Sequence, residues 1–179
     1  MRVAWSIVVL AFALVPSMDV GEQPASDWPS FSGKALVLPS HYTAWPVVGA
    51  SLGMTYSGGP QHGPGSFHRV YMNPTALAQY QRNGSFPEGT TFVLEIREAL
   101  QRTSILRGGF FEGRRVALEG SVKDRTRYPE GWAYFDFDNG ARTTGSMFAD
   151  TECHSCHAEH GEKDSVFVQF YPLLRGDKE

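Results

Sequence analysis

The chain has 179 residues, a length that fits a single domain, and its formal net charge is −3. The sequence contains no run of like charge and no basic patch, which excludes the cationic surface on which nucleic-acid binding depends. Aromatic residues make up 13% of the chain, a rich supply for one core or for an aromatic pocket.

The N-terminus is typical of a secretory signal peptide. A single positive charge at Arg2 precedes an apolar run from Ala4 to Val15, and a proline and a serine follow it. This run is too short to cross a membrane comfortably, so we predict a signal peptide over residues 1–20. An uncleaved membrane anchor is the alternative.

Residues 21–39 are rich in proline, serine and glycine, and this composition predicts a flexible N-terminal segment. The packed domain is expected over residues 40–176. Within it, short apolar runs, several of which alternate with polar residues and one of which is densely aromatic, predict strands, and 90–99 is the strongest of them. The predicted strands are 47–56, 67–72, 90–99, 116–123, 132–137 and 166–171.

Two short helices are predicted among these strands. Asn73 is expected to cap the first helix, because Pro74 suits a first helical turn, and Leu77 and Tyr80 then share its buried face. The second helix is expected within residues 148–162, near the C-terminus. The pattern as a whole indicates a mainly β (α+β) protein with a few short helices.

The second helix carries the only two cysteines of the chain, in the sequence Cys-His-Ser-Cys-His that ends at His157. C-x-x-C-H is the pattern of covalent c-type haem attachment. Two thiols three positions apart, Cys153 and Cys156, can each form a thioether with one vinyl group of the porphyrin. His157 then lies beneath the iron and can supply an axial nitrogen. We therefore predict one covalently bound haem c, held by these three residues.

Three other kinds of site could use the same part of the chain. A zinc site could combine Cys153, Cys156, His157 and His160, although these ligands are crowded together. The cysteine pair could be redox-active, although such a pair normally opens a helix after an early strand and here it comes late. A structural disulfide between the two cysteines is the third alternative.

Beyond this motif, the chain resembles the cytochrome P-460 and cytochrome c′-β family. The resemblance rests on segments that occur in a common order and together run from about His41 to Arg175. These segments are Val70–Pro74, Phe86–Thr90, Leu118–Asp124, Cys153–His157 and Val166–Arg175. The resemblance implies a mainly antiparallel β-sheet fold with the haem motif near the C-terminus. It also implies one covalent haem with His157 as the proximal iron ligand, and a homodimer.

The family contains two kinds of protein, and the sequence departs from one of them at a decisive position. The first kind oxidises hydroxylamine and has a lysine, in the strand after the Phe-x-x-Gly-Thr turn, that is cross-linked to the porphyrin. Counted from Gly89, that position is Leu94, which has no nitrogen with which to form the bond. The second kind lacks the cross-link, has an apolar distal face and binds small gases such as NO and CO.

One feature of the hydroxylamine-oxidising kind is retained. Glu119 matches a distal carboxylate that serves there in proton transfer, and a solvent-facing glutamate paired with Arg114 or Arg115 is the alternative. Leu94 and Phe92 share a strand face and are expected to line the distal side of the haem. For Phe92, simple core packing explains the residue equally well.

Three further side chains are candidates for the sixth position of the iron. They are Met72, His68 and Met147, and an ordinary core or surface role suits each of them better. A methionine or histidine ligand at that position would favour electron transfer.

These observations favour a periplasmic monohaem cytochrome that binds a small nitrogen ligand, NO, at an open distal site. A hydroxylamine or peroxide oxidoreductase that uses Glu119 is the main alternative, an electron-transfer cytochrome is the next, and a zinc-binding module is the last. Export agrees with the haem motif, because thioether attachment takes place outside the cytoplasm in bacteria. The expected partners are the small ligand and a redox partner protein, with no nucleic acid.

Overall fold

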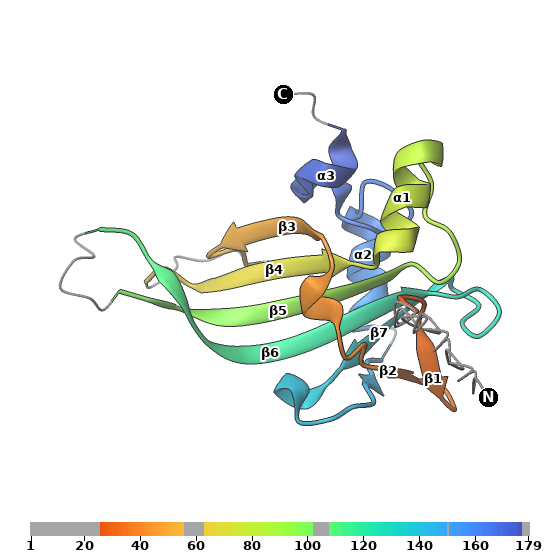
Figure 1. Ribbon diagram of the computed structural model, residues 1–179, viewed down its shortest axis with the longest axis horizontal. Coiled ribbons are helices and arrows are strands. Elements are labelled where there is room, and N and C mark those ends of the chain that lie inside the picture. Colours follow the sequence, from red (N-terminus) through yellow and green to blue (C-terminus); the bar gives the residue numbers. More distant parts are fainter. Residues whose placement is uncertain (1–25, 56–62, 102–107, 150, 177–179) are drawn as a thin grey trace, which may run out of the picture.

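One six-stranded antiparallel sheet organises the chain, and it confirms the mainly antiparallel β fold (Figure 1). The computed structural model describes residues 26–55, 63–101, 108–149 and 151–176. The strands follow one another in space as they do in sequence. They are β3 (Val47–Leu52), β4 (Ser66–Met72), β5 (Thr91–Leu100), β6 (Phe111–Lys123), β7 (Trp132–Asp136) and β8 (Ser146–Met147).

Short helices and a small hairpin complete the described fold. The hairpin pairs β1 (Ser30–Ser32) with β2 (Ala35–Val37). The helical elements are η1 (Tyr42–Ala44), α1 (Pro74–Asn83), η2 (Asp138–Gly140), α2 (His154–His160), η3 (Val168–Phe170) and α3 (Pro172–Arg175). Among the described residues, no helix is long and apolar enough to cross a membrane. The predicted signal peptide, residues 1–20, lies outside the described residues.

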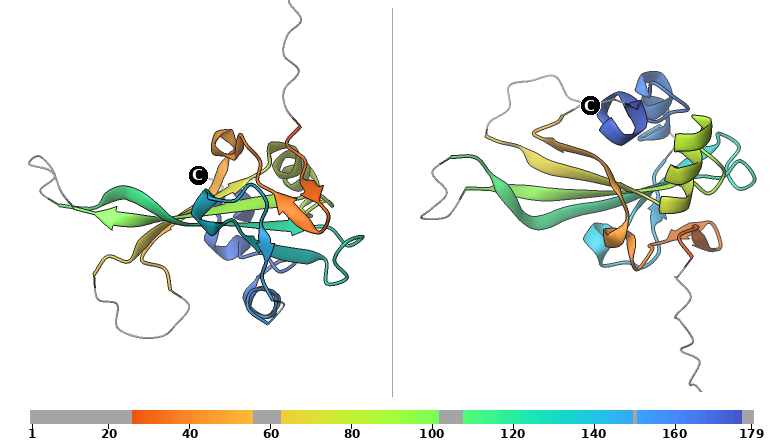
Figure 2. Two further views of the ribbon diagram at one scale, coloured as in Figure 1. Left: turned by 90° about the horizontal axis from the view of Figure 1, so that it is seen from below. Right: turned by 45° about the horizontal axis from the view of Figure 1, so that its top comes forward.

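The two faces of the sheet support two separate hydrophobic cores. Successive residues of a strand point to opposite faces, so Phe92 packs on one side with α1 and α3 while Val93 packs on the other with β2 and η1. Figures 1 and 2 show α1, α2 and α3 on one side of the sheet and the β1–β2 hairpin on the other. The haem motif lies in α2 and therefore on the face to which Phe92 points.

The N-terminal segment is more ordered than its composition indicated. Residues 30–37, within the predicted flexible segment 21–39, form the β1–β2 hairpin, and Leu36 is completely buried in the second core. The prediction is wrong for this part because one apolar side chain anchors the hairpin beneath the sheet. Residues 21–25 lie outside the described residues.

The same segment caps helix α1. The carboxylate of Asp27 accepts hydrogen bonds from the backbone N–H of Thr75, at 2.6 Å, and from its hydroxyl, at 2.9 Å. Asn73, the predicted cap, makes no capping bond from its side chain and instead accepts a hydrogen bond from the N–H of Thr91. The helix begins where predicted, but its cap comes from a residue distant in sequence.

The last predicted strand, 166–171, is absent from the structure. Asp164 and Ser165 both adopt left-handed backbone conformations, with φ of 50° and 59°, and they turn the chain across the sheet face. The N–H of Phe170 then bonds the carbonyl of Phe167 at 2.9 Å, which forms η3. The segment therefore satisfies its own backbone and does not pair with a sheet edge.

Candidate cofactor pocket

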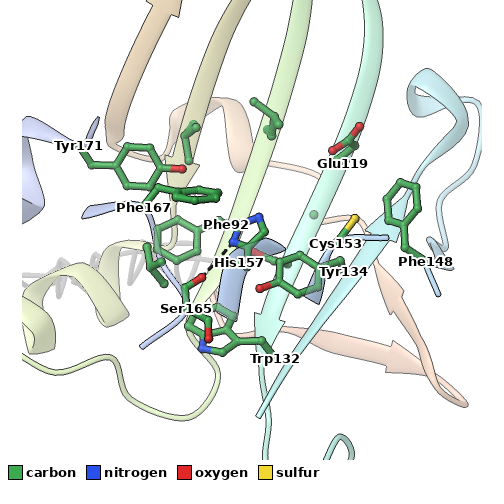
Figure 3. Close-up of a pocket in the computed structure, with 15 residues that line it drawn as sticks. Phe92, Glu119, Trp132, Tyr134, Phe148, Cys153, His157, Ser165, Phe167 and Tyr171 are labelled. Atoms are coloured by element: carbon green, nitrogen blue, oxygen red, sulfur yellow. Dashed lines mark hydrogen bonds between the residues drawn. The ribbon is translucent and has the colours of Figure 1, made fainter. Parts of the chain in front are cut away.

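A cavity lies between the sheet and the C-terminal segment. Three side chains from neighbouring strands, Val70, Leu94 and Glu119, form one cross-strand row of its wall. His157 and Cys153 complete the wall from the side of α2 (Figure 3). We call this cavity the pocket.

His157 is held in one orientation by its surroundings. Its Nδ1 atom lies 2.9 Å from the carbonyl oxygen of Ser165, which can only accept, so Nδ1 carries the proton. Its ring packs between Tyr134 and Phe167, with centroid distances of 4.5 Å and 4.4 Å (Figure 3). Burial lowers the pKa of His157. The Nε2 atom of a neutral imidazole is therefore left with a free lone pair, as a metal ligand requires.

The two cysteines stand one helical turn apart at the start of α2. Cys153 directly precedes the helix and lines the pocket, whereas Cys156 is half-buried and lies within the helix. Burial raises the pKa of the Cys153 thiol to about 11, with a further contribution from the Glu119 carboxylate. Both cysteines are free thiols in the structure, so the disulfide alternative is not formed.

A close backbone approach holds α2 against the loop that follows it. A Cβ atom at Gly161 would lie 2.6 Å from the carbonyl oxygen of His157 and 2.6 Å from the backbone of Ser165. Only glycine allows this approach, and the approach brings the Ser165 carbonyl within reach of the His157 ring. The geometry of the histidine thus depends on one residue without a side chain.

Glu119 faces the pocket and not the solvent. Its neighbour Leu118 is completely buried in the opposite core, and the alternation along β6 directs Glu119 to the pocket side. Burial raises the pKa of Glu119, and the nearby Asp136 carboxylate raises it further. Neither suggested partner binds it in the described structure, since Arg114 pairs with Glu98 and Arg115 with Glu95.

Leu94 and Phe92 both line the pocket, as their shared strand face requires. Leu94 is half-buried and lies next to Glu119 across the β5–β6 pairing. Phe92 is only 6% exposed, stacks on Trp132 with ring centroids 5.9 Å apart, and also belongs to the core. Phe92 therefore belongs both to the pocket wall and to the hydrophobic core.

None of the three candidate sixth ligands of the iron lines the pocket. Met72 is completely buried in the core and does not line the pocket. Met147 is half exposed, on the outer strand β8. His68 lines a groove that adjoins the pocket and shares Leu94 and Glu119 with it, and burial lowers the pKa of this histidine.

Sequence reasoning did not identify the aromatic residues that form much of the wall. Trp132 and Tyr134, from the aromatic strand β7, point into the pocket, and the alternation along that strand was the available signal. The indole N–H of Trp132 and the hydroxyl of Tyr134 are buried without a hydrogen-bond partner among the described residues. Such groups are rarely left unsatisfied, so a bound molecule or water is expected to meet them.

No other described lysine takes the place of the cross-linking lysine, and the zinc alternative can be checked in the same way. Lys34, Lys123 and Lys163 do not line it, and Lys178 lies outside the described residues. Among the described residues, no three His, Cys, Asp or Glu side chains converge as a zinc site requires.

The residues present fit a haem. The Nε2 atom of His157 is unprotonated, two thiols stand one helical turn apart at the pocket edge, and flat aromatic rings form the walls. A protein-family model described as cytochrome P460 matches residues 39–168, well over half of the chain. The comparison of this chain with curated proteins gave no match.

Proposed function

The chain belongs to the cytochrome P460 family, and we propose that it is a monohaem c-type cytochrome that binds NO at an open distal haem site, without a haem–lysine cross-link. Cys153 and Cys156 attach the haem in this proposal, and His157 is its proximal ligand. When bound, the haem supplies an iron that can take a small nitrogen compound as its second axial ligand.

The identity of one wall residue carries the proposal. Leu94 occupies the position at which the cross-linking lysine is expected, it lines the pocket, and no described lysine lines the pocket with it. A leucine side chain cannot form a covalent bond to the porphyrin or coordinate iron. Together with Phe92 it makes this part of the wall apolar, which suits a small, weakly polar ligand such as NO better than a hydrated one.

Glu119 supports a second candidate function, the oxidation of hydroxylamine. The reaction must remove protons from its substrate, and a buried carboxylate at the pocket wall can accept them. The raised pKa of Glu119 brings the group closer to the pH at which such a base works well. In the family this activity is accompanied by a lysine cross-link to the haem. No described lysine lines the pocket, which weighs against this second function.

Absorption spectra test these functions directly. The protein would be produced in a host that attaches c-type haem, and ferric and ferrous spectra would be recorded with and without NO. A five-coordinate spectrum that changes on NO addition is the expected result. A strongly red-shifted ferrous Soret band would show a cross-link and overturn the proposal in favour of hydroxylamine oxidation. A six-coordinate spectrum indifferent to NO would overturn it in favour of electron transfer.

Location and assembly complete the proposal. The apolar run near the N-terminus and the haem-attachment motif both support export to the periplasm, where a redox partner protein could exchange electrons with the haem. A homodimer is proposed from the family resemblance. Cell fractionation and light scattering of the purified protein test these two points separately.

A further inference from the structure

We infer that Lys123 is a positioning residue for the proximal histidine, acting through Asp164 on the turn whose Ser165 carbonyl orients His157. The inference rests on the proposed attachment of haem at His157 but not on the identity of the distal ligand. Lys123 lies at the end of β6, outside the pocket, and makes no contact with the bound group in this account.

The first step is the burial of Lys123. Its side chain is only 5% exposed, and its ammonium donates a hydrogen bond to the carbonyl of Phe86 at 2.8 Å and another to the carboxylate of Asp164 at 2.5 Å. Its backbone is fixed as well, because its N–H bonds the carbonyl of Thr90 at 2.9 Å. A buried cation is retained only where it is paired, so this ammonium joins two loops that are distant in sequence.

The second step is the turn that Lys123 holds. Asp164 and Ser165 are consecutive left-handed residues, with φ of 50° and 59°, a conformation that is uncommon for non-glycine residues and rarer still for two in succession. The ion pair to Lys123, at 2.5 Å, holds the side chain of the first of these residues, and the exposed Arg125 lies farther from the same carboxylate, at 3.9 Å. The backbone of the second then presents its carbonyl to His157 at 2.9 Å.

The third step is the effect on the histidine. A proximal imidazole that donates its Nδ1–H to a carbonyl is a stronger electron donor through Nε2 and keeps one ring orientation. Loss of the Lys123–Asp164 pair frees the turn and weakens this bond. The haem iron would then receive less electron density, its Fe–His bond would weaken and its reduction potential would rise.

The test compares variants of the haem-loaded protein. K123M removes the ammonium but keeps most of the length of the side chain, and D164N removes the carboxylate charge at a residue whose side chain is 31% exposed. The readouts are the Fe–His stretching frequency of the ferrous protein, by resonance Raman spectroscopy, and the reduction potential. Both variants are expected to shift the frequency down and the potential up. The double variant should shift them no further than the larger single change, because the two residues act as a unit.

Lys163 provides the matched control. It lies in the same loop, but its ammonium stands over the ring of Tyr80, 5.3 Å from the centroid. K163M is expected to leave both readouts at their wild-type values. Unchanged values in folded, haem-loaded K123M and D164N would overturn the inference and leave the pair a purely stabilising contact.

Failure of this inference is distinguishable from failure of the proposed function. If K123M does not accumulate as a folded protein, D164N alone decides, since it alters the same contact from the more exposed side. A wild-type protein that ignores NO would contradict the proposed function only. The reduction potential still reports on His157 when the sixth position is filled, so its shift in D164N would continue to support the role of Lys123.

Discussion

Glu119 and Asp136 stand directly opposite each other on strands β6 and β7, which places the Asp136 carboxylate beside a carboxylate of the pocket wall. Burial raises the pKa of Glu119, and the charge of the neighbouring Asp136 carboxylate raises it further. The pair gives the pocket an acid that keeps its proton to a higher pH than an ordinary glutamate.

Replacement of Glu119 should change how stability depends on pH. Because the pKa of Glu119 is raised in the folded protein, its contribution is fully present below its ordinary value of 4.5 and is lost as the pH rises through the folded pKa. E119Q should therefore be more stable than wild type near neutral pH, and the difference should vanish in acid. Thermal unfolding of the haem-loaded proteins across this range measures it. In a D136N background, the difference in stability between E119Q and its parent should be smaller, because the Asp136 charge is gone. A difference that does not change with pH would contradict the raised pKa of Glu119.

Phe92 and Leu94 should differ sharply in their cost to stability. F92A removes a core aromatic ring that stacks on Trp132 and should cost about 3–5 kcal/mol. L94A shortens a half-buried side chain and should cost only about 1–2 kcal/mol. Urea unfolding of each variant provides the comparison. Equal costs would show that Leu94 is as tightly packed as the core.

Glu95, on the face of the sheet opposite the pocket, should stabilise the fold through its partners. Burial alone would raise its pKa, but hydrogen bonds from Tyr42 and Arg97, together with Arg115, lower it overall. E95Q should cost roughly 2 kcal/mol, less than the ~3–5 kcal/mol of a fully buried pair, since both arginines remain more than a quarter exposed.

The sign of the pH effect at Glu95 is opposite to that at Glu119. A lowered folded pKa gives stability that is present above the ordinary value of 4.5 and is lost as the pH falls through the folded pKa. The advantage of wild type over E95Q should therefore be largest at neutral pH and shrink in acid. Urea unfolding of both proteins at neutral and acidic pH tests this, and an advantage that grows in acid would refute it.

The cap that Asp27 provides to α1 should add measurably to the stability of the protein, although Asp27 lies outside the helix. D27A leaves the N–H of Thr75 without its acceptor and should destabilise the protein by about 1 kcal/mol, the usual cost of losing a cap. D27N keeps an acceptor oxygen and serves as the control, with a smaller loss expected. Chemical denaturation is the measurement, and an unchanged midpoint in D27A would mean that water replaces the cap at no cost.

Much of the fold could be predicted because its signals are local. Alternation in 90–99 predicted β5, the dense aromatic residues of 132–137 predicted β7, and the pair Asn73-Pro74 predicted where α1 begins. The prediction of a strand at 166–171 was wrong because the apolar residues of this segment suit a strand or a buried turn equally well. Only the path of the chain after the left-handed pair Asp164–Ser165 distinguishes the two.

The sequence by itself determined the chemistry of the motif. The spacing from Cys153 to His157 is a local property, and any helix brings the two thiols and the imidazole onto neighbouring positions. It also determined that Leu94 and Glu119 belong to strands, since each lies in an alternating run. These features depend on residues that are close together along the chain.

The tertiary structure decided what surrounds that motif. Whether Glu119 meets solvent or a pocket, which carbonyl orients His157, and which charge holds Asp164 all depend on residues that are distant in sequence. Alternation states that two faces exist but not what covers each of them. The packing of α2 and its following loop over one face, and of the β1–β2 hairpin over the other, decided these points, because it gives each face different neighbours.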